Sequence, residues 1–313
     1  MLSFLARRFL TLVGTAFAAS LVVFLVLEVV PGDPALLQLG IEASPEAVER
    51  LRAEMGLNRS AVVRYVDWIG GLLTLDFGRS FTYSTPVGEL IAQRIAVTLP
   101  LALMALLVST LIAIPLGMFA AANRNRAGDY GVMTFSQIGV AIPNFWFGIL
   151  LILLFAVHWQ VFDTGFPGWD EGLFAGLKAL VLPAAALALG EAAILARITR
   201  SAVLETMRED YVRTARAKGL SRWQVMTRHV LRNALIPIST IVGLQFALLL
   251  AGSIIIEEVF QLPGLGKLLI QAIGQRDFQV IKNAVVLFAV LVVFVNFLVD
   301  ALYAAIDPRP KQA

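Results

Sequence analysis

The chain has no cysteine, only two histidines and few charged residues. The lack of cysteine excludes disulfides, thiolate metal sites and cysteine nucleophiles. His158 and His229 are not spaced as a metal-binding pair, so a histidine-based zinc site has little to build on. Only 15% of the 313 residues are charged while 58% are hydrophobic, which leaves too little polar surface for a soluble domain of this length. The composition therefore predicts a membrane protein without a metal site or another cofactor.

Long uncharged runs predict six membrane-spanning helices. Several exceed the roughly 20 residues that a helix needs to cross a bilayer. The first run is too long for the apolar region of a signal peptide, so it is interpreted as an uncleaved anchor. Pro143 lies in the third run and predicts a kink there. The expected spans cover residues 9–30, 95–122, 132–157, 173–196, 234–256 and 284–306.

The distribution of lysine and arginine predicts the orientation of these spans. Segments 1–8, 123–131, 197–233 and 307–313 together hold fifteen basic residues, whereas segments 31–94, 158–172 and 257–283 hold nine. Basic residues concentrate in short cytoplasmic loops. We therefore expect a multi-pass membrane protein with both termini in the cytoplasm.

This topology divides the chain into four parts. Residues 1–30 form a cytoplasmic segment with the first span, 31–93 an extracytoplasmic insert, 94–306 a transmembrane core that includes the connecting segment 197–233, and 307–313 a cytoplasmic tail. The insert holds eight acids and five basic residues. It includes a helical stretch at 45–57 that Ser44 can cap, with Ala47 at the third position of the helix. A binding surface and a simple cover over the helix ends are equally good interpretations of the insert.

The connecting segment 197–233 carries nine basic residues against three acids. Leu204, Met207, Tyr211 and Ala215 recur at three- and four-residue steps, which predicts one apolar stripe along a helix. On periodicity alone, a basic amphipathic connector lying on anionic lipid is a slightly better interpretation than a functional element.

Two residues predict a corner within this segment. Gly219 stands where a helix ends in the left-handed conformation, and Lys218 before it suits the negative end of the helix dipole. Ser221 can then cap a second helix that runs into the fifth span.

The stretch 211–221, Y-V-R-T-A-R-A-K-G-L-S, is similar to the cytoplasmic coupling motif of ABC importer permeases, in particular of the dipeptide/oligopeptide/nickel branch. Arg213 and Thr214 replace the Glu and first Ala of the wider superfamily's E-A-A-x-x-x-G, so a Glu-mediated contact with an ATPase is not available here. Other motifs of the branch follow in order: V-P-G-D-P at 30–34, M-G-L at 55–57, D-F-G-R-S at 76–80, P-N-F-W-F-G at 143–148, L-R-N-A-L-I-P at 231–237 and E-x-x-F-x-x-P-G-x-G at 257–266. Over nearly its whole length, the chain resembles the first (B-type) permease subunit of that branch.

The resemblance implies an all-α, multi-pass protein of the bacterial inner (plasma) membrane with the type I ABC importer transmembrane fold and six transmembrane helices. The implied partners are a second homologous permease subunit, two cytoplasmic ATPase subunits, an extracytoplasmic solute-binding protein and the lipid bilayer, but no nucleic acid. The chain lacks G-x-x-x-x-G-K-[ST], so we expect a transport subunit without an ATPase site or catalytic residues of its own. The expected ATPase-coupling residues are Tyr211, Arg213, Thr214, Ala215, Arg216, Ala217, Lys218 and Gly219. The expected extracytoplasmic gate or binding-protein contact comprises Glu257, Phe260, Pro263, Gly264 and Gly266.

Two other functions compete with this interpretation. A secondary transporter usually shows inverted repeats or an intramembrane charge pair, and an intramembrane enzyme needs a catalytic constellation. None of these features is evident in the sequence.

Glu191 is the deepest acid in the spans, and Arg197 and Arg200 are its candidate partners. The substrate stays open between dipeptides, longer peptides, glutathione, nickel complexes and sugars, as does the choice between a heterodimer and a homodimer.

Overall fold

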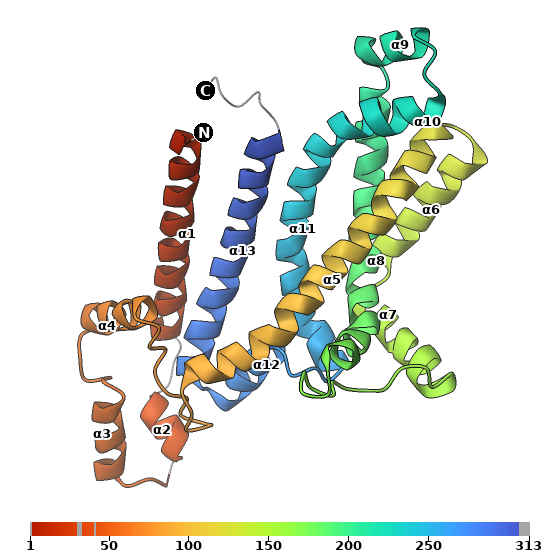
Figure 1. Ribbon diagram of the computed structural model, residues 1–313. Helices are drawn as coiled ribbons and strands as arrows, with labels where there is room; N and C mark the ends of the chain where they lie inside the picture. Colours follow the sequence, from red (N-terminus) through yellow and green to blue (C-terminus); the bar gives the residue numbers. More distant parts are fainter. Residues whose placement is uncertain (1, 30–32, 41, 307–313) are drawn as a thin grey trace. The chain divides into compact units, whose positions relative to one another are not determined.

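The computed structural model describes residues 2–29, 33–40 and 42–306, and this part of the chain is mainly helical without a β-strand. Figure 1 shows the helices in chain order. They are α1 (Leu2–Val29), α2 (Pro34–Leu39), α3 (Pro45–Glu54), α4 (Ala61–Leu73), α5 (Val87–Ala122), α6 (Ala127–Ala141), α7 (Asn144–Leu151), the π-helical η1 (Ile152–His158), α8 (Leu173–Thr206), α9 (Asp210–Ala217), α10 (Arg222–Gln224), the π-helical η2 (Val225–Leu231), α11 (Arg232–Val259), α12 (Leu265–Gln275) and α13 (Phe278–Ile306).

Five helical runs are long and apolar enough to cross a membrane: α1, α5, α8, α10 to α11, and α13. The third expected span, 132–157, is not one kinked helix but two helices bent by 97°. The break has a local cause, because Pro143 cannot donate a backbone hydrogen bond and forces the preceding residue out of the helical region. Ile142 and Pro143 both have extended backbones, with ψ of 123° and 131°. The expected six spans are therefore found only if this bent pair counts as one.

The chain forms two compact units. The first unit is built mainly from Thr98–Leu262 and the second from Ala6–Val97 together with Pro263–Phe294. In the first unit α8 packs against α6, α7 and α11. Glycines permit this close packing: a Cβ added at Gly117 of α5 would lie 2.5 Å from the Cβ of Thr199 on α8.

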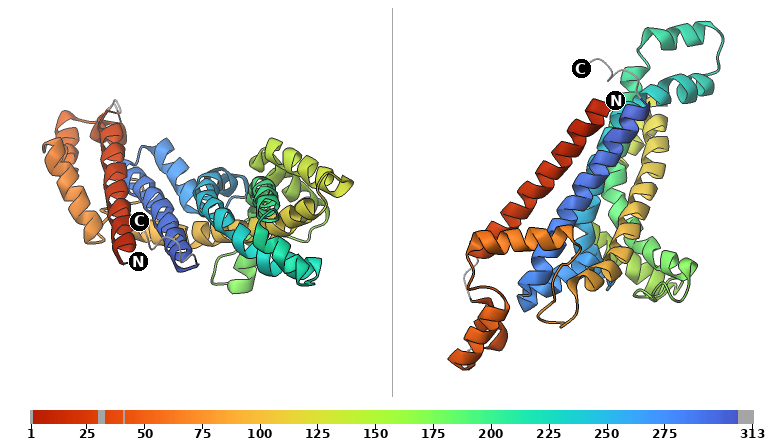
Figure 2. Two further views of the ribbon diagram at one scale, coloured as in Figure 1. Left: turned by 90° about the horizontal axis from the view of Figure 1, so that it is seen from above. Right: turned by 60° about the vertical axis from the view of Figure 1, so that its left-hand side comes forward.

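In the second unit α4 crosses the C-terminal end of α1 (Figures 1 and 2). Tyr65 of α4 packs edge-on against the ring of Phe24, and its hydroxyl lies 2.9 Å from the Ser20 hydroxyl. Trp68 of α4 donates from its indole nitrogen to Asn283 of α13 at 3.0 Å. These side chains fix α4 between α1 and α13.

Two expectations for the insert are tested here. Ser44 caps α3 as expected, because its hydroxyl accepts a hydrogen bond from the Ala47 backbone N–H at 3.3 Å. The second expected span begins earlier than residue 95, since α5 starts at Val87. Its first turns are buried with Leu265 and Leu268 of α12 and Val280 of α13 in the core of the second unit.

Candidate functional site

The connecting segment contains a helix break that the sequence analysis missed. The long helix α8 ends at Thr206, and Glu209 has an extended backbone (φ −65°, ψ 144°) before α9 begins. Because of this break, the expected apolar stripe from Leu204 to Ala215 does not lie on one helix. Tyr211 of that stripe is 40% exposed, whereas its neighbour Val212 is buried.

The short helix α9 is attached to the first unit by its inner face. Val212 is fully buried and Ala215 is 5% exposed. Both belong to one apolar cluster that includes Val203 of α8 and Val225 and Val230 of η2. Burying these side chains holds α9 against the ends of two membrane helices.

The end of α9 confirms the left-handed helix end predicted at Gly219. Its φ is +84°, and its N–H donates to the carbonyl of Arg216 at 3.0 Å while Leu220 N–H donates to the carbonyl of Ala215 at 3.4 Å. This pair of bonds is the Schellman motif, in which a left-handed residue closes the helix and satisfies two end carbonyls. A side chain other than glycine at position 219 would be strained although nothing lies within 4 Å of its Cβ.

The next helix begins at Arg222, and Ser221 caps it as predicted. The Ser221 hydroxyl accepts from Gln224 N–H at 3.3 Å, and the Gln224 side chain accepts from Ser221 N–H at 3.0 Å. This reciprocal capping box starts a helical run that continues from Arg222 to Val259. The π-helical stretch within the run, η2, was not predicted.

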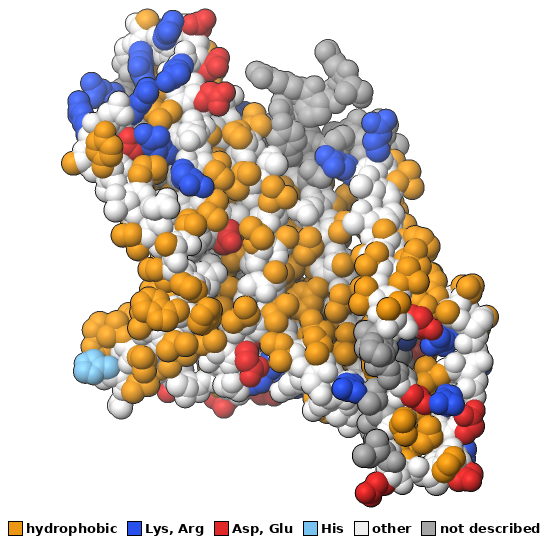
Figure 3. Space-filling model, turned by 180° about the vertical axis from the view of Figure 1, so that it is seen from behind, with side chains coloured by type: hydrophobic (Ala, Val, Ile, Leu, Met, Phe, Trp, Pro, Cys, Tyr) orange, Lys and Arg blue, Asp and Glu red, His pale blue; other side chains and the backbone are white. Residues whose placement is uncertain are grey.

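The outer face of α9 is exposed and basic. In Figure 3, Lys and Arg side chains gather at this end of the first unit, beside a zone dominated by hydrophobic side chains. Ala215 differs from the other expected coupling residues because it faces inward and is covered by the chain itself. The exposed members of the set are Tyr211, Arg213, Thr214, Arg216, Ala217, Lys218 and Gly219.

A buried ion pair stabilises the end of α8 next to α9. Asp129 of α6 is 2% exposed and accepts two hydrogen bonds from the Arg200 guanidinium, at 2.5 and 2.6 Å, and one from Asn125 N–H at 2.9 Å. The expectation that Arg200 pairs with Glu191 is therefore wrong. The carbonyl of Glu191 instead accepts from the Gln245 side chain at 2.8 Å.

The residues expected at the extracytoplasmic gate are largely buried. In the first unit, Glu257 is fully buried and accepts from the Thr98 hydroxyl at 2.6 Å, and Phe260 is 9% exposed. In the second unit, Gly264 precedes α12 as its N-cap, and both it and Gly266 are buried while Pro263 is half-buried. These residues lie at the ends of α11 and α12, where the chain itself covers most of them.

No group of three or more His, Asp or Glu side chains in the described part of the chain is arranged to hold a metal ion.

Family models match almost the whole chain. Residues 113–312 match the binding-protein-dependent transport system inner membrane component, and residues 1–102 match the N-terminal model of such membrane components. The chain belongs to this family. The description of this family as a transport system component agrees with the expected transport subunit.

Relatives match over their full lengths. The chain is 42% identical over 312 residues to a Brucella abortus (strain 2308) protein that its name places in a peptide transport system as a permease, covering 99% of both chains. It is 39% identical to the oligopeptide transport system permease of Bacillus subtilis (strain 168), with 99% coverage of both. It is 36% identical to the dipeptide transport system permease of Escherichia coli (strain K12), covering 99% of this chain and 98% of that one.

The fold also has a counterpart among solved structures. An inward-facing structure of the MetNI methionine ABC transporter matches with a TM-score of 0.59 at 21% identity, covering 70% of this chain and 97% of that one. This likeness confirms the type I ABC importer transmembrane fold.

Proposed function

We propose that this chain is a permease subunit of an ATP-driven importer and forms part of the path for short peptides. The three relatives above carry names of peptide, dipeptide and oligopeptide systems, and each match spans 98% or more of both chains. Full-length similarity includes the insert as well as the membrane core, so it supports the same subunit role and not only the same fold.

The proposed assembly contains four further proteins: a related second permease, two cytoplasmic ATPase subunits and an extracytoplasmic solute-binding protein. In this assembly both termini and α9 face the cytoplasm, and residues 31–93 form the extracytoplasmic insert. The excess of basic residues in segment 197–233 supports this orientation.

The geometry of α9 is the observation that best supports the coupling role. Its inner face is anchored through Val212 and Ala215, while its outer face is exposed and basic. Arg216 and Lys218 supply positive charge for acidic groups on an ATPase subunit. When the ATPase pair closes, the anchored helix would carry that movement into α8 and α11 and bias the inward–outward equilibrium of the membrane helices.

A glycine pair tests this role with a matched control. Gly219 and Gly165 both have positive φ, +84° and +91°, and open space around the Cβ position. Gly219→Val and Gly165→Val therefore introduce comparable backbone strain, but only the first lies at the coupling corner. In reconstituted vesicles with the complete importer, we expect Gly219→Val to lose most peptide uptake while ATP hydrolysis and assembly persist, and Gly165→Val to transport normally. Unchanged uptake in Gly219→Val would reject the coupling role.

The proposed orientation can be tested separately because the chain has no native cysteine. Single cysteines at the exposed positions Ala217 and Asn58 lie in the connecting segment and the insert. A membrane-impermeant maleimide added to intact spheroplasts should label Asn58→Cys only, and Ala217→Cys should react after permeabilisation. The reverse pattern would overturn the orientation and the coupling role with it.

Experiments on the purified chain alone distinguish two other classes of function. Peptide uptake by the purified chain alone, driven by an ion gradient without ATP, would indicate a secondary transporter. Peptide cleavage by the isolated chain would indicate an intramembrane enzyme.

A further inference from the structure

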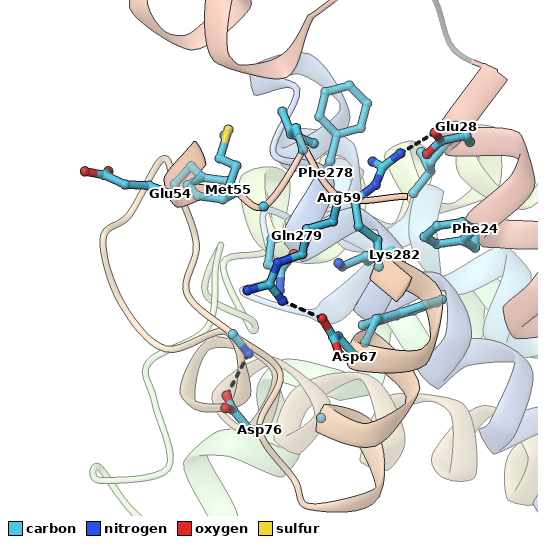
Figure 4. Close-up of a pocket in the computed structure, with 18 of the residues that line it drawn as sticks. Phe24, Glu28, Glu54, Met55, Arg59, Asp67, Asp76, Phe278, Gln279 and Lys282 are labelled. Atoms are coloured by element: carbon cyan, nitrogen blue, oxygen red, sulfur yellow. Dashed lines mark hydrogen bonds and ion pairs between the residues drawn. The ribbon is translucent and has the colours of Figure 1, made fainter. Parts of the chain in front are cut away.

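The second unit contains a cavity of about 440 Å³ that the proposed transport function does not use. Its walls come from the C-terminal end of α1, the α3–α4 connection, α4 and the first turns of α13 (Figure 4). This volume lies in the range of small-ligand sites, which combine apolar walls with a few placed polar groups.

Among the described residues, the charged groups around the cavity leave one cation without a carboxylate partner. Arg59 pairs with Asp67 at 2.8 Å, and Arg64 pairs with Glu28. In Figure 4, Glu54 points away from the cavity, whereas Lys282 points into it. The Asp76 side chain accepts a hydrogen bond within its own loop, from Gly78 N–H at 3.0 Å.

Lys282 therefore has an unusual environment. Its ammonium lies 5.3 Å from the centre of the Trp68 ring, and within the described residues it makes no ion pair with a carboxylate. The charged group that acts on it is the guanidinium of Arg64, which has the same sign. A largely buried ammonium beside another cation favours an anionic ligand, because burial of an uncompensated charge is costly.

The position of the cavity limits the source of that anion. Phe24 and Leu27 lie in the last two turns of the membrane helix α1, and Phe278 is the first residue of α13. The cavity thus lies at the ends of two spans, at the level where lipid headgroups meet the hydrocarbon layer. The helix α4 supports this placement, because its Val62, Val66 and Leu73 are 72%, 61% and 81% exposed, as on a helix that lies in the membrane interface.

We propose that this cavity binds an oxyanion, and specifically the phosphate of an acidic phospholipid headgroup, with Lys282 as its counter-ion. The phosphate would lie beside the Lys282 ammonium, while Phe24, Leu27, Trp68 and Phe278 contact the glycerol and upper acyl carbons. Free phosphate offers the same oxygen chemistry without the apolar part. This site holds a structural or regulatory lipid and does not depend on which solute is transported.

The test measures lipid binding to the intact importer in detergent by native mass spectrometry. Phosphatidylglycerol, phosphatidylcholine and inorganic phosphate are titrated separately. Lys282→Gln removes the charge and Lys282→Arg keeps it. Lys178→Gln is the matched control, because Lys178 also lies near the start of a membrane helix and over an aromatic ring, Phe162, at 5.7 Å, but outside this cavity.

We expect wild type, Lys282→Arg and Lys178→Gln to retain phosphatidylglycerol in preference to phosphatidylcholine. Lys282→Gln should bind phosphatidylglycerol roughly tenfold more weakly, the effect of losing one charge-assisted contact. The unfolding temperatures of the variants check that weaker lipid binding is not caused by unfolding. Lys282→Arg, which keeps the positive charge, provides a second check.

Two results would overturn the proposal in different ways. Lys282-dependent binding of inorganic phosphate, with no preference between the two lipids, would assign the oxyanion site to a soluble ion and reject the lipid. Equal binding of phosphatidylglycerol by wild type and Lys282→Gln, with no binding of phosphate to either, would reject an anion site altogether.

Discussion

The helices α1 and α8 are both apolar enough to cross a membrane, yet they have opposite environments. In the most apolar stretch of α8, 67% of the residues are buried inside the structure, against 6% in α1. The buried face of α8 is rich in alanine, which allows neighbouring backbones to approach, whereas α1 exposes Phe17, Val22 and Val26. Hydropathy therefore identifies a span, and the size of its side chains indicates whether that span packs against its own chain.

The largest expected difference comes from adding volume next to α8, at Gly117 of α5, or on α1 itself. Gly117→Val would place a Cβ 2.5 Å from the Thr199 Cβ and 2.7 Å from the Ala196 carbonyl oxygen of α8, so backbone must shift. Gly14→Val on α1 meets nothing within 4 Å. We expect Gly117→Val to lose about 3 kcal/mol of stability or to fail to accumulate, and Gly14→Val to behave as wild type. Thermal unfolding of the purified proteins measures both, and equal stability would contradict the contrast.

An ion pair on each helix gives the second comparison. Asp129→Asn leaves the guanidinium of Arg200 on α8 without its charged partner, where the side chains are only 3% and 22% exposed. We expect a loss of about 3 kcal/mol. Glu28→Gln on α1 breaks a pair with Arg64 whose side chains are 35% and 23% exposed, and should cost below about 1 kcal/mol. Denaturant titration in detergent distinguishes these outcomes, and a larger effect for Glu28→Gln would be inconsistent with them.

For hydroxyl groups, the larger loss of stability is expected on α1 and not on α8. The Ser20 hydroxyl of α1 lies 2.9 Å from the Tyr65 hydroxyl, whereas the buried Thr199 hydroxyl of α8 has no hydrogen-bond partner within the described part of the chain. Ser20→Ala should lose about 1 kcal/mol, and the isosteric Thr199→Val should be neutral or slightly stabilising. The same titration tests both variants, and a destabilised Thr199→Val would indicate that its hydroxyl has a partner in the membrane.

The smallest effect lies just beyond α1, at Asp33. Desolvation is the largest influence and raises the pKa of Asp33, but the hydrogen bonds from Arg52 and Ala35 N–H together lower it below its ordinary value of 3.8. A lowered pKa means that this carboxylate stabilises the fold at pH values above 3.8 and that its contribution disappears as the pH falls through the lower value. A small difference in unfolding temperature between wild type and Asp33→Asn at pH 6 should therefore vanish near pH 2.

Local signals in the sequence predicted the elements that depend on a few adjacent residues. Gly219 and Ser221 have short-range partners, three to five residues away, so their roles as helix end and cap could be assigned from the sequence. The proline at position 143 predicted an interruption, but not its angle of 97°.

Long-range partners could not be predicted in the same way. Asp129 and Arg200 are 71 residues apart, and Trp68 and Asn283 are 215 residues apart. No periodicity links such pairs. The wrong apolar stripe has a different cause, because a helical repeat was extended through Glu209, where the backbone leaves the helix.

The corner at Gly219–Ser221 also determines how far a small movement extends. The helical run that begins at Arg222 continues through η2 and α11 for 38 residues, so it follows the corner without a non-helical break. Because both helix ends at the corner are closed by hydrogen bonds, no long flexible linker separates α9 from this run. A displacement of α9 would therefore reach the start of the membrane helix directly.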